Sequence, residues 1–175
     1  MAIFEYKGMK PQIGPDCYIA ESAEVIGRVV LGEGVYVGPG AKIRGDYGKI
    51  EIGEGTAVEE NCVIHARPEE TCRIGSRVTL GHMCMVHNAK LIDDYAVIGM
   101  GSIVSDWATV GKWSVVAEGG LVKNRQAVPP GKIAAGSPVR VIGDVKEAYK
   151  KDWQRFKQLY VDIAATYSTD LKRIG

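Results

Sequence analysis

The sequence has no basic run, no long apolar stretch and few cysteines. Its 175 residues carry 22 Lys and Arg against 21 Asp and Glu, a net charge of +1, which argues against nucleic acid as a partner. It has no stretch of 18 apolar residues and its N-terminus lacks a signal-peptide pattern, so we expect a soluble cytoplasmic protein without a membrane partner. Four cysteines in such a chain do not suggest a disulfide framework.

What the sequence does contain is a six-residue repeat of apolar anchor positions. Ile, Leu or Val occurs at eighteen such positions, and the fourth residue after each anchor is mostly small. A strand this short cannot bury its apolar side alone, so the period predicts stacked coils of a parallel β-helix. The anchors are Ile13, Ile19, Val25, Leu31, Val37, Ile43, Ile52, Val58, Ile64, Ile74, Leu80, Val86, Ile92, Ile98, Val104, Val110, Val116 and Val122.

Three hexads per coil give an all-β domain of about six coils, which with flanking extended segments occupies residues 1–142. We expect the hexads to end at Val122. Residues 143–175 change to an apolar period of three to four residues, which predicts a C-terminal α-helix. Asp144 is the expected N-cap. We expect this helix to pack on the β-helix or on a neighbouring subunit.

Two insertions interrupt the period at the same point of the coil. Three extra residues lie between Ile43 and Ile52, and four extra residues lie between Ile64 and Ile74. Both follow the third hexad of a coil, so we expect two loops at one corner of the prism. Loops on a rigid scaffold are candidates for the wall of a functional site.

All three histidines occupy defined places in the repeat. His65 and His87 each follow an anchor and are three hexads apart, so their side chains should stack one coil apart on one edge. Arg44 has the same place one coil earlier, and Asp46 lies just beyond it. His82 lies on another face and cannot converge with the other two within one chain.

A closed ring of three chains would bring His82 of one chain to His65 and His87 of the next. Three imidazoles with an open fourth position are the arrangement of a catalytic zinc site. The alternative is that the histidines are ordinary surface side chains that share water.

Several segments resemble the γ-class carbonic anhydrase family of hexapeptide-repeat proteins, over about residues 10–142. They are residues 43–50, 59–65, 80–87 and 135–138. The resemblance is greatest to the branch found beside phenylacetate-degradation and carnitine-metabolism genes. It implies a left-handed β-helix, a homotrimer, and zinc, or iron or cobalt, bound by His65, His82 and His87.

The resemblance also implies roles for residues around the metal. Arg44 and Asp46 would form an ion pair across the subunit interface. Glu59 takes the place of a Gln that positions the metal-bound water or bicarbonate. Tyr47 stands where active members have a Glu for proton transfer. The predicted metal ligands are therefore kept, whereas the residues around them differ.

These features lead to one functional hypothesis and its alternatives. The first is a metal-hydroxide enzyme that hydrates CO2 to bicarbonate, with Glu59, Arg44 and Asp46 as catalytic residues. The alternatives are an acyl-CoA thioesterase or acyltransferase on the same fold, and a catalytically silent metal-binding trimer. Residues 136–138 resemble the acyltransferase segment near CoA. Acyl transfer with a single His as general base would leave the stacked pair unexplained.

Overall fold

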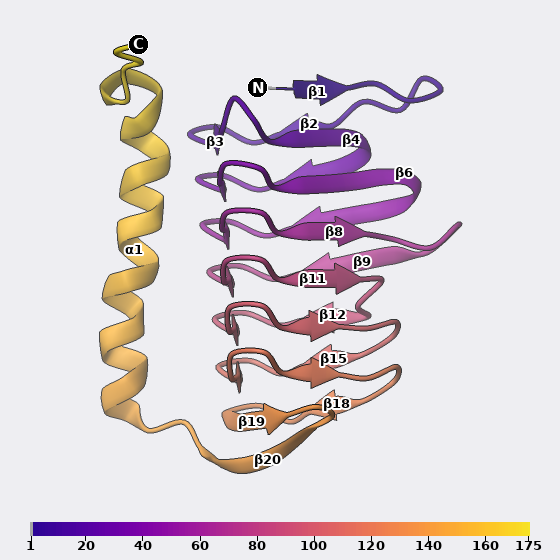
Figure 1. Cartoon of the computed structure of the whole chain (residues 1–175), viewed down its shortest axis with the longest axis vertical. Coiled ribbons are helices and arrows are strands. Elements are labelled where there is room, and N and C mark those ends of the chain that lie inside the picture. The colour runs from indigo at the N-terminus through magenta and orange to yellow at the C-terminus, as the bar shows by residue number, and fades with distance from the viewer. Residues whose placement is uncertain (1) are drawn as a thin grey trace.

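The computed structural model describes residues 2–175 as a parallel β-helix with one α-helix beside it (Figure 1). The predicted fold class is confirmed. Strands on the first face are β1 (Ala2–Phe4), β8 (Val63–His65), β11 (Met85–His87), β14 (Ile103–Val104) and β17 (Leu121–Val122). Those on the second face are β2 (Gln12–Ile13), β9 (Thr71–Ile74), β12 (Leu91–Ile92), β15 (Thr109–Val110) and β18 (Ala127–Val128).

The third face forms a sheet of its own. It contains β3 (Tyr18–Ile19), β5 (Tyr36–Val37), β7 (Ala57–Val58), β10 (Thr79–Leu80), β13 (Val97–Ile98), β16 (Val115–Val116), β19 (Lys132–Gly136) and β20 (Val139–Asp144). Strands one coil apart pair in parallel, so that Val86 lies opposite Ile64, and Ile64 lies opposite Ile43. The anchors thereby form apolar ladders inside the prism, where most are fully buried.

The β-helix has about seven turns rather than the predicted six. Val128 pairs with Val110, and Ala134 pairs with Val116, so the six-residue spacing continues past Val122. The expectation that the hexads end at Val122 was wrong. Val128 keeps the spacing, but Pro129, Pro130 and Gly131 directly after it suggest a turn, and Ala134 is too small to stand out as an anchor. After this partial coil, β20 pairs antiparallel with β19 and ends the stack.

The first insertion is not a loop. β4 (Glu24–Leu31) and β6 (Lys42–Ile52) are long strands that run round the corner from the first face to the second (Figure 1). Gly27 pairs with Gly45 at this corner, and a Cβ on Gly45 would lie 2.5 Å from the Arg28 carbonyl oxygen. The extra residues are therefore absorbed in strand pairing. The second insertion does form a loop, residues 66–70, between β8 and β9.

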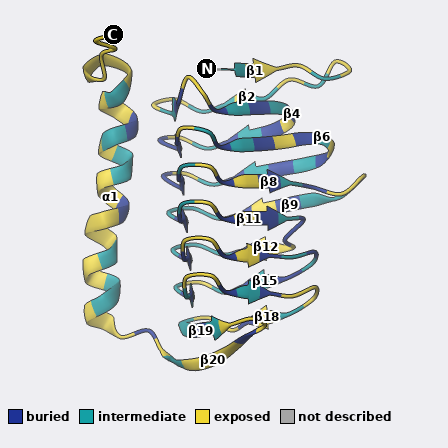
Figure 2. Cartoon of the chain, viewed as in Figure 1, coloured by how far each residue is buried: buried dark blue, intermediate teal, exposed yellow. Residues whose placement is uncertain are grey.

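Helix α1 (Glu147–Asp170) begins after Lys146 rather than at the predicted cap. Asp144 is instead the last residue of β20, where its carboxylate pairs with Lys132. The helix lies along the third face against β3, β5 and β7, and its inward side is the better buried one (Figure 2). No helix within residues 2–175 is long and apolar enough to cross a membrane.

Aromatic and polar contacts fix α1 to the coils. Tyr160 packs against Tyr36 with ring centroids 5.2 Å apart, and Tyr167 packs against Tyr18 at the same distance. Lys157 is buried and donates hydrogen bonds to Thr79 Oγ1 at 2.9 Å and to the Ala96 carbonyl at 3.2 Å. The predicted apolar stripe is only partly buried, since the Phe156 side chain is exposed.

Candidate functional site

Arg44, His65 and His87 lie one above another on adjacent coils, as the repeat predicted. The register pairs Arg44 with His65, and His65 with His87. The two imidazole centroids are 5.5 Å apart, and the ring of Tyr47 lies 5.5 Å from that of His65. This edge faces the corner between the first and second faces, on the side away from α1.

His65 is held by the two charged residues that precede it by one coil. Its Nε2 lies 3.0 Å from Asp46 Oδ1 and 3.3 Å from Arg44 Nη2. Arg44 Nε also lies 3.5 Å from Asp46 Oδ2, so this ion pair forms within one chain. The tautomer of His65 decides whether Nε2 donates to Asp46 or accepts from Arg44. In either state, the ring has little exposure to solvent and a fixed orientation.

His87 is paired with a carboxylate that the sequence did not reveal. Its Nδ1 lies 2.8 Å from Asp106 Oδ1, and the Asp106 side chain is only 8% exposed. Arg67 donates from Nε and Nη2 to the two carboxylate oxygens, each at 2.8 Å. This bidentate pair, with a smaller effect from His87, lowers the pKa of Asp106 despite the opposing effect of burial. Asp106 is therefore an anion near neutral pH.

An ionised Asp106 fixes the proton of neutral His87 on Nδ1. His87 Nε2 then carries the lone pair, and no described residue hydrogen-bonds to it. The side chain is 37% exposed, more than the 16% of His65. Within residues 2–175, His87 is thus the histidine with both an orienting carboxylate and an accessible basic nitrogen.

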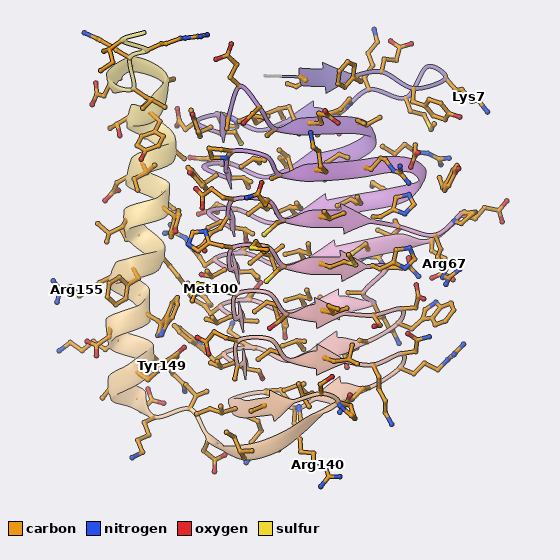
Figure 3. The ribbon with its side chains drawn as sticks, viewed as in Figure 1. Lys7, Arg67, Met100, Arg140, Tyr149 and Arg155 are labelled. Atoms are coloured by element: carbon orange, nitrogen blue, oxygen red, sulfur yellow. The ribbon has the colours of Figure 1, made fainter. Side chains whose placement is uncertain are left out.

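The second insertion loop braces this edge. Asn88 donates to Glu70 Oε2 at 3.1 Å and accepts from the backbone N–H of Arg67 at 3.2 Å. Glu70 also accepts from Trp107 Nε1 at 2.9 Å. Figure 3 shows Arg67 at the edge of the stack opposite α1. The loop therefore supplies both the arginine that holds Asp106 and the carboxylate that holds Trp107.

A groove of about 470 Å³ leads along the first face to the two imidazoles. Most of its lining is apolar, including Ile26, Val63 and Met85. Its polar lining residues are Glu24, Lys42, Arg44, His65 and His87. Val63 is 39% exposed and Met85 is 46% exposed. An apolar group in this groove would place its end beside His87.

His82 and Glu59 lie at a different corner, next to α1. His82 Nδ1 is 2.5 Å from a Glu60 oxygen, and its Nε2 is 3.2 Å from Glu59 Oε2. Glu59 is buried and also accepts the backbone N–H of His82 at 3.1 Å. Burial, with added effects from Glu59, raises the pKa of Tyr160 on the helix. In one chain, Glu59 is therefore remote from Arg44 and Asp46.

The donor set of one chain does not complete a metal site. Within residues 2–175, no three His, Cys, Asp or Glu side chains are grouped so that they could hold a metal ion. His65 and His87 offer two neighbouring imidazoles, and His82 faces elsewhere, as the repeat predicted. Zinc binding by His65, His82 and His87 stays a prediction that requires a second chain.

Comparison with known proteins agrees with the fold and extends it. Residues 10–45 match the family model described as bacterial transferase hexapeptide (six repeats). The carnitine operon protein CaiE of Citrobacter koseri is 36% identical over 94% of this chain and 83% of its own length. The product of the BC4754 gene of Bacillus cereus is 32% identical with a TM-score of 0.93, over 98% of both chains.

A third relative was solved with ligands. Perosamine N-acetyltransferase of Caulobacter crescentus, in complex with CoA and GDP-perosamine, is 28% identical with a TM-score of 0.65. That match covers 76% of this chain and 58% of the enzyme. These relatives favour the transferase alternative and give no support to carbonic anhydrase activity.

Fold and site together define a hexapeptide-repeat β-helix whose edge carries a histidine–carboxylate pair. The chain belongs to the hexapeptide transferase family, together with the carnitine operon protein CaiE.

Proposed function

We propose that the protein transfers an acyl group from a CoA thioester, with His87 as general base. The observation that carries this proposal is the chain of contacts from Arg67 through Asp106 to His87 Nδ1, which leaves Nε2 basic and accessible. A carboxylate that orients a histidine and stabilises its cation is the recurring basis of such catalysis. The CoA complex of the Caulobacter relative supports the choice of acyl donor.

His87 and Asp106 are sufficient for the proton transfers of the chemical step. His87 Nε2 removes the proton from an acceptor amine or hydroxyl, whose N or O then attacks the thioester carbonyl. The C–S bond breaks, and the departing CoA sulfur takes the proton from the imidazolium. Asp106 stabilises the imidazolium while it exists. The groove beside Val63 and Met85 is placed to receive an apolar acyl chain. With water as acceptor, the same step is thioester hydrolysis.

The test is release of CoA from acetyl-CoA by the purified chain, with a panel of small amines and alcohols and with water alone. His87→Asn should lower the rate roughly 100- to 10,000-fold, the usual contribution of a general base. His82→Asn is the matched control and should leave the rate within about twofold. An unchanged rate in His87→Asn would remove the proposal.

A second candidate function is the metal-dependent hydration of CO2 predicted from the sequence. The observation that favours it is the closeness of the His65 and His87 rings on adjacent coils, with centroids 5.5 Å apart and planes tilted by 52°, which general-base chemistry does not require. His65 and His87 of one chain and His82 of a neighbour would hold the ion in a homotrimer. A bound zinc would supply a hydroxide nucleophile near neutral pH.

Metal analysis and stopped-flow CO2 hydration separate the two candidates. Under the metal reading, His82→Ala loses both bound metal and turnover. Under general-base acyl transfer, thioester turnover survives chelation and survives His82→Ala.

A further inference from the structure

Helix α1 has a hollow on the side that faces away from the coils. Its volume is about 480 Å³, and its lining residues are Asp152, Arg155, Phe156, Gln158, Leu159 and Asp162. Because every lining residue belongs to α1, the hollow opens on the outer side of the helix, which Figure 2 shows as largely exposed. Neither the proposed acyl transfer nor the metal alternative uses this surface.

Two large apolar side chains lie in the middle of this outer face. Phe156 is 54% exposed and Leu159 is 53% exposed, whereas α1 buries Lys157 and Ala164 on its other side. Residues three apart on a helix are neighbours on its surface, so Phe156 and Leu159 form one patch. An apolar patch with a charged rim is the composition of a protein contact surface.

The charges on either side of this patch are not neutralised within the chain. Arg155 precedes Leu159 by four residues and Asp162 follows it by three, so both lie on its side of the helix. Among residues 2–175, neither Arg155 nor Asp162 lies at ion-pair distance from an opposite charge, and Asp162 accepts a hydrogen bond from the neutral Gln158 at 2.8 Å. Figure 3 shows Arg155 projecting from α1 away from the coils. A cation and an anion therefore flank the apolar patch.

This order of charges is complementary to itself when a second helix runs in the opposite direction. With a two-fold axis that passes between Gln158 and Leu159, residue 155 of one copy lies opposite residue 162 of the other. Two Arg155–Asp162 pairs then flank a centre made of Leu159 and Phe156 from both copies. A parallel two-fold pair would instead set Arg155 against Arg155 and Asp162 against Asp162, and these like charges repel.

We propose that the outer face of α1 binds the outer face of α1 from a second copy of this chain, in an antiparallel pair. The helix is already fixed to its own coils through Tyr160 and Lys157, so the surface is preformed and binding orders little further. A contact of one helix pair is small, so we expect association that depends on protein concentration.

This contact differs from the ring of three chains predicted from the sequence. The ring would join the corner of His82 to the edge of His65 and His87, whereas the helix pair uses the side of α1 turned away from the coils. A two-fold contact closes on two partners. It would therefore join two single chains or two rings in the same way, and it doubles the mass in either case.

Sedimentation equilibrium of the full chain over a range of concentrations tests the contact. The average mass of the wild-type protein should rise towards twice that of Leu159→Lys, because the variant places an ammonium group in the apolar centre of the contact. The exposed position of Leu159 should leave the fold of the variant unchanged, which circular dichroism checks. A wild-type mass equal to that of Leu159→Lys at every concentration overturns the proposal.

Charge reversal identifies the partner as a second copy. Arg155→Asp alone and Asp162→Arg alone each create two like-charge pairs, and each should weaken self-association at least about tenfold, or 1.4 kcal/mol. An equimolar mixture of the two variants restores both ion pairs, so it should associate within about threefold of the wild-type protein. A mixture that associates as weakly as the single variants overturns the proposal and assigns the outer face to a different protein.

A matched mixture separates the specific pairs from attraction between oppositely charged proteins. Lys7→Glu, far from α1 (Figure 3), changes the net charge by the same amount as Arg155→Asp. When it is mixed with Asp162→Arg, one like-charge pair remains at each contact, so association should be at least about threefold weaker than in the first mixture. Equal association of the two mixtures would mean that net charge alone joins the chains, and it would overturn the helix pair.

Discussion

Asp106 holds the imidazole of His87, one coil earlier in the stack, through a 2.8 Å contact to Nδ1. The carboxylate cannot turn away, because Arg67 grips both of its oxygens. The coil spacing thus sets the distance between His87 and Asp106. Arg67, from the insertion loop, keeps Asp106 ionised.

Replacing Asp106 by Asn should lower thioester turnover while leaving the shape of the site intact. The amide keeps the volume but loses the negative charge that stabilises the imidazolium, so we expect a loss of roughly 100-fold or more in kcat. Steady-state kinetics with acetyl-CoA measure it. Equal kcat values for the variant and the wild-type protein would show that Asp106 has no part in the chemical step.

The same residue should make stability depend on acid. The pKa of Asp106 is lowered in the folded chain, so its contribution to folding is present above the unfolded pKa, near 3.8 to 3.9, and is lost as pH falls through the lower folded value. We expect Asp106→Asn to cost about 1–3 kcal/mol of unfolding free energy at pH 7. Urea unfolding of both proteins measures this cost. The difference in unfolding free energy between wild type and Asp106→Asn should be smaller below pH 4 than at pH 7.

Lys157 should also make stability rise with pH, but in a higher pH range than Asp106. Burial lowers its pKa to about 7 from 10.5, so between these values the unfolded chain binds more protons than the folded one. The free energy of unfolding therefore rises with pH in that window, by at most about 1.4 kcal/mol per unit.

Comparison with Lys157→Met isolates this effect from other titrating groups. The stability difference, wild type minus variant, should increase between pH 7 and pH 9.5. A constant difference would mean that Lys157 stays charged in its buried position.

A methyl group at Gly45 should disturb both folding and the His65 contacts. Its Cβ would lie 2.5 Å from the Arg28 carbonyl oxygen, and backbone on both strands would have to move. We expect Gly45→Ala to cost about 2 kcal/mol or more. Gly143→Ala, where a Cβ meets nothing within 4 Å, is the control and should change stability by less than about 0.5 kcal/mol. Thermal unfolding of both variants measures the difference.

The repeat explains how far the sequence could lead. Because strands pair in register every coil, the stacking of His65 on His87 and of Arg44 on His65 follows from counting residues. The same count one coil further aligns Ser105 with His87 and Asp106 with Asn88, so it brings Asp106 near His87 but does not reveal the contact between their side chains. It could not have found Arg67, since the position of an arginine in a four-residue insertion depends on loop conformation.

Two further differences between the predicted and the observed structure have local causes. The seventh turn was not predicted because the Pro129, Pro130 and Gly131 that follow Val128 resemble a turn and because the side chain of Ala134 is small. Asp144 was expected to cap α1, but the antiparallel pairing of β20 with β19 continues to that residue and offers it Lys132 instead. In both places, tertiary pairing overrode a sound local pattern.

The path of α1 has a consequence for the order in which the molecule comes apart. In a stack where each coil touches only its neighbours, the terminal coils are free to fray. Here the helix leaves from the C-terminal end through β20 and contacts β3, β5 and β7 in the first three coils. Helix α1 thereby links the two ends of the β-helix. The first coils can unfold early only if α1 detaches from them. Hydrogen exchange of the first coils should therefore report the attachment of a segment more than a hundred residues away.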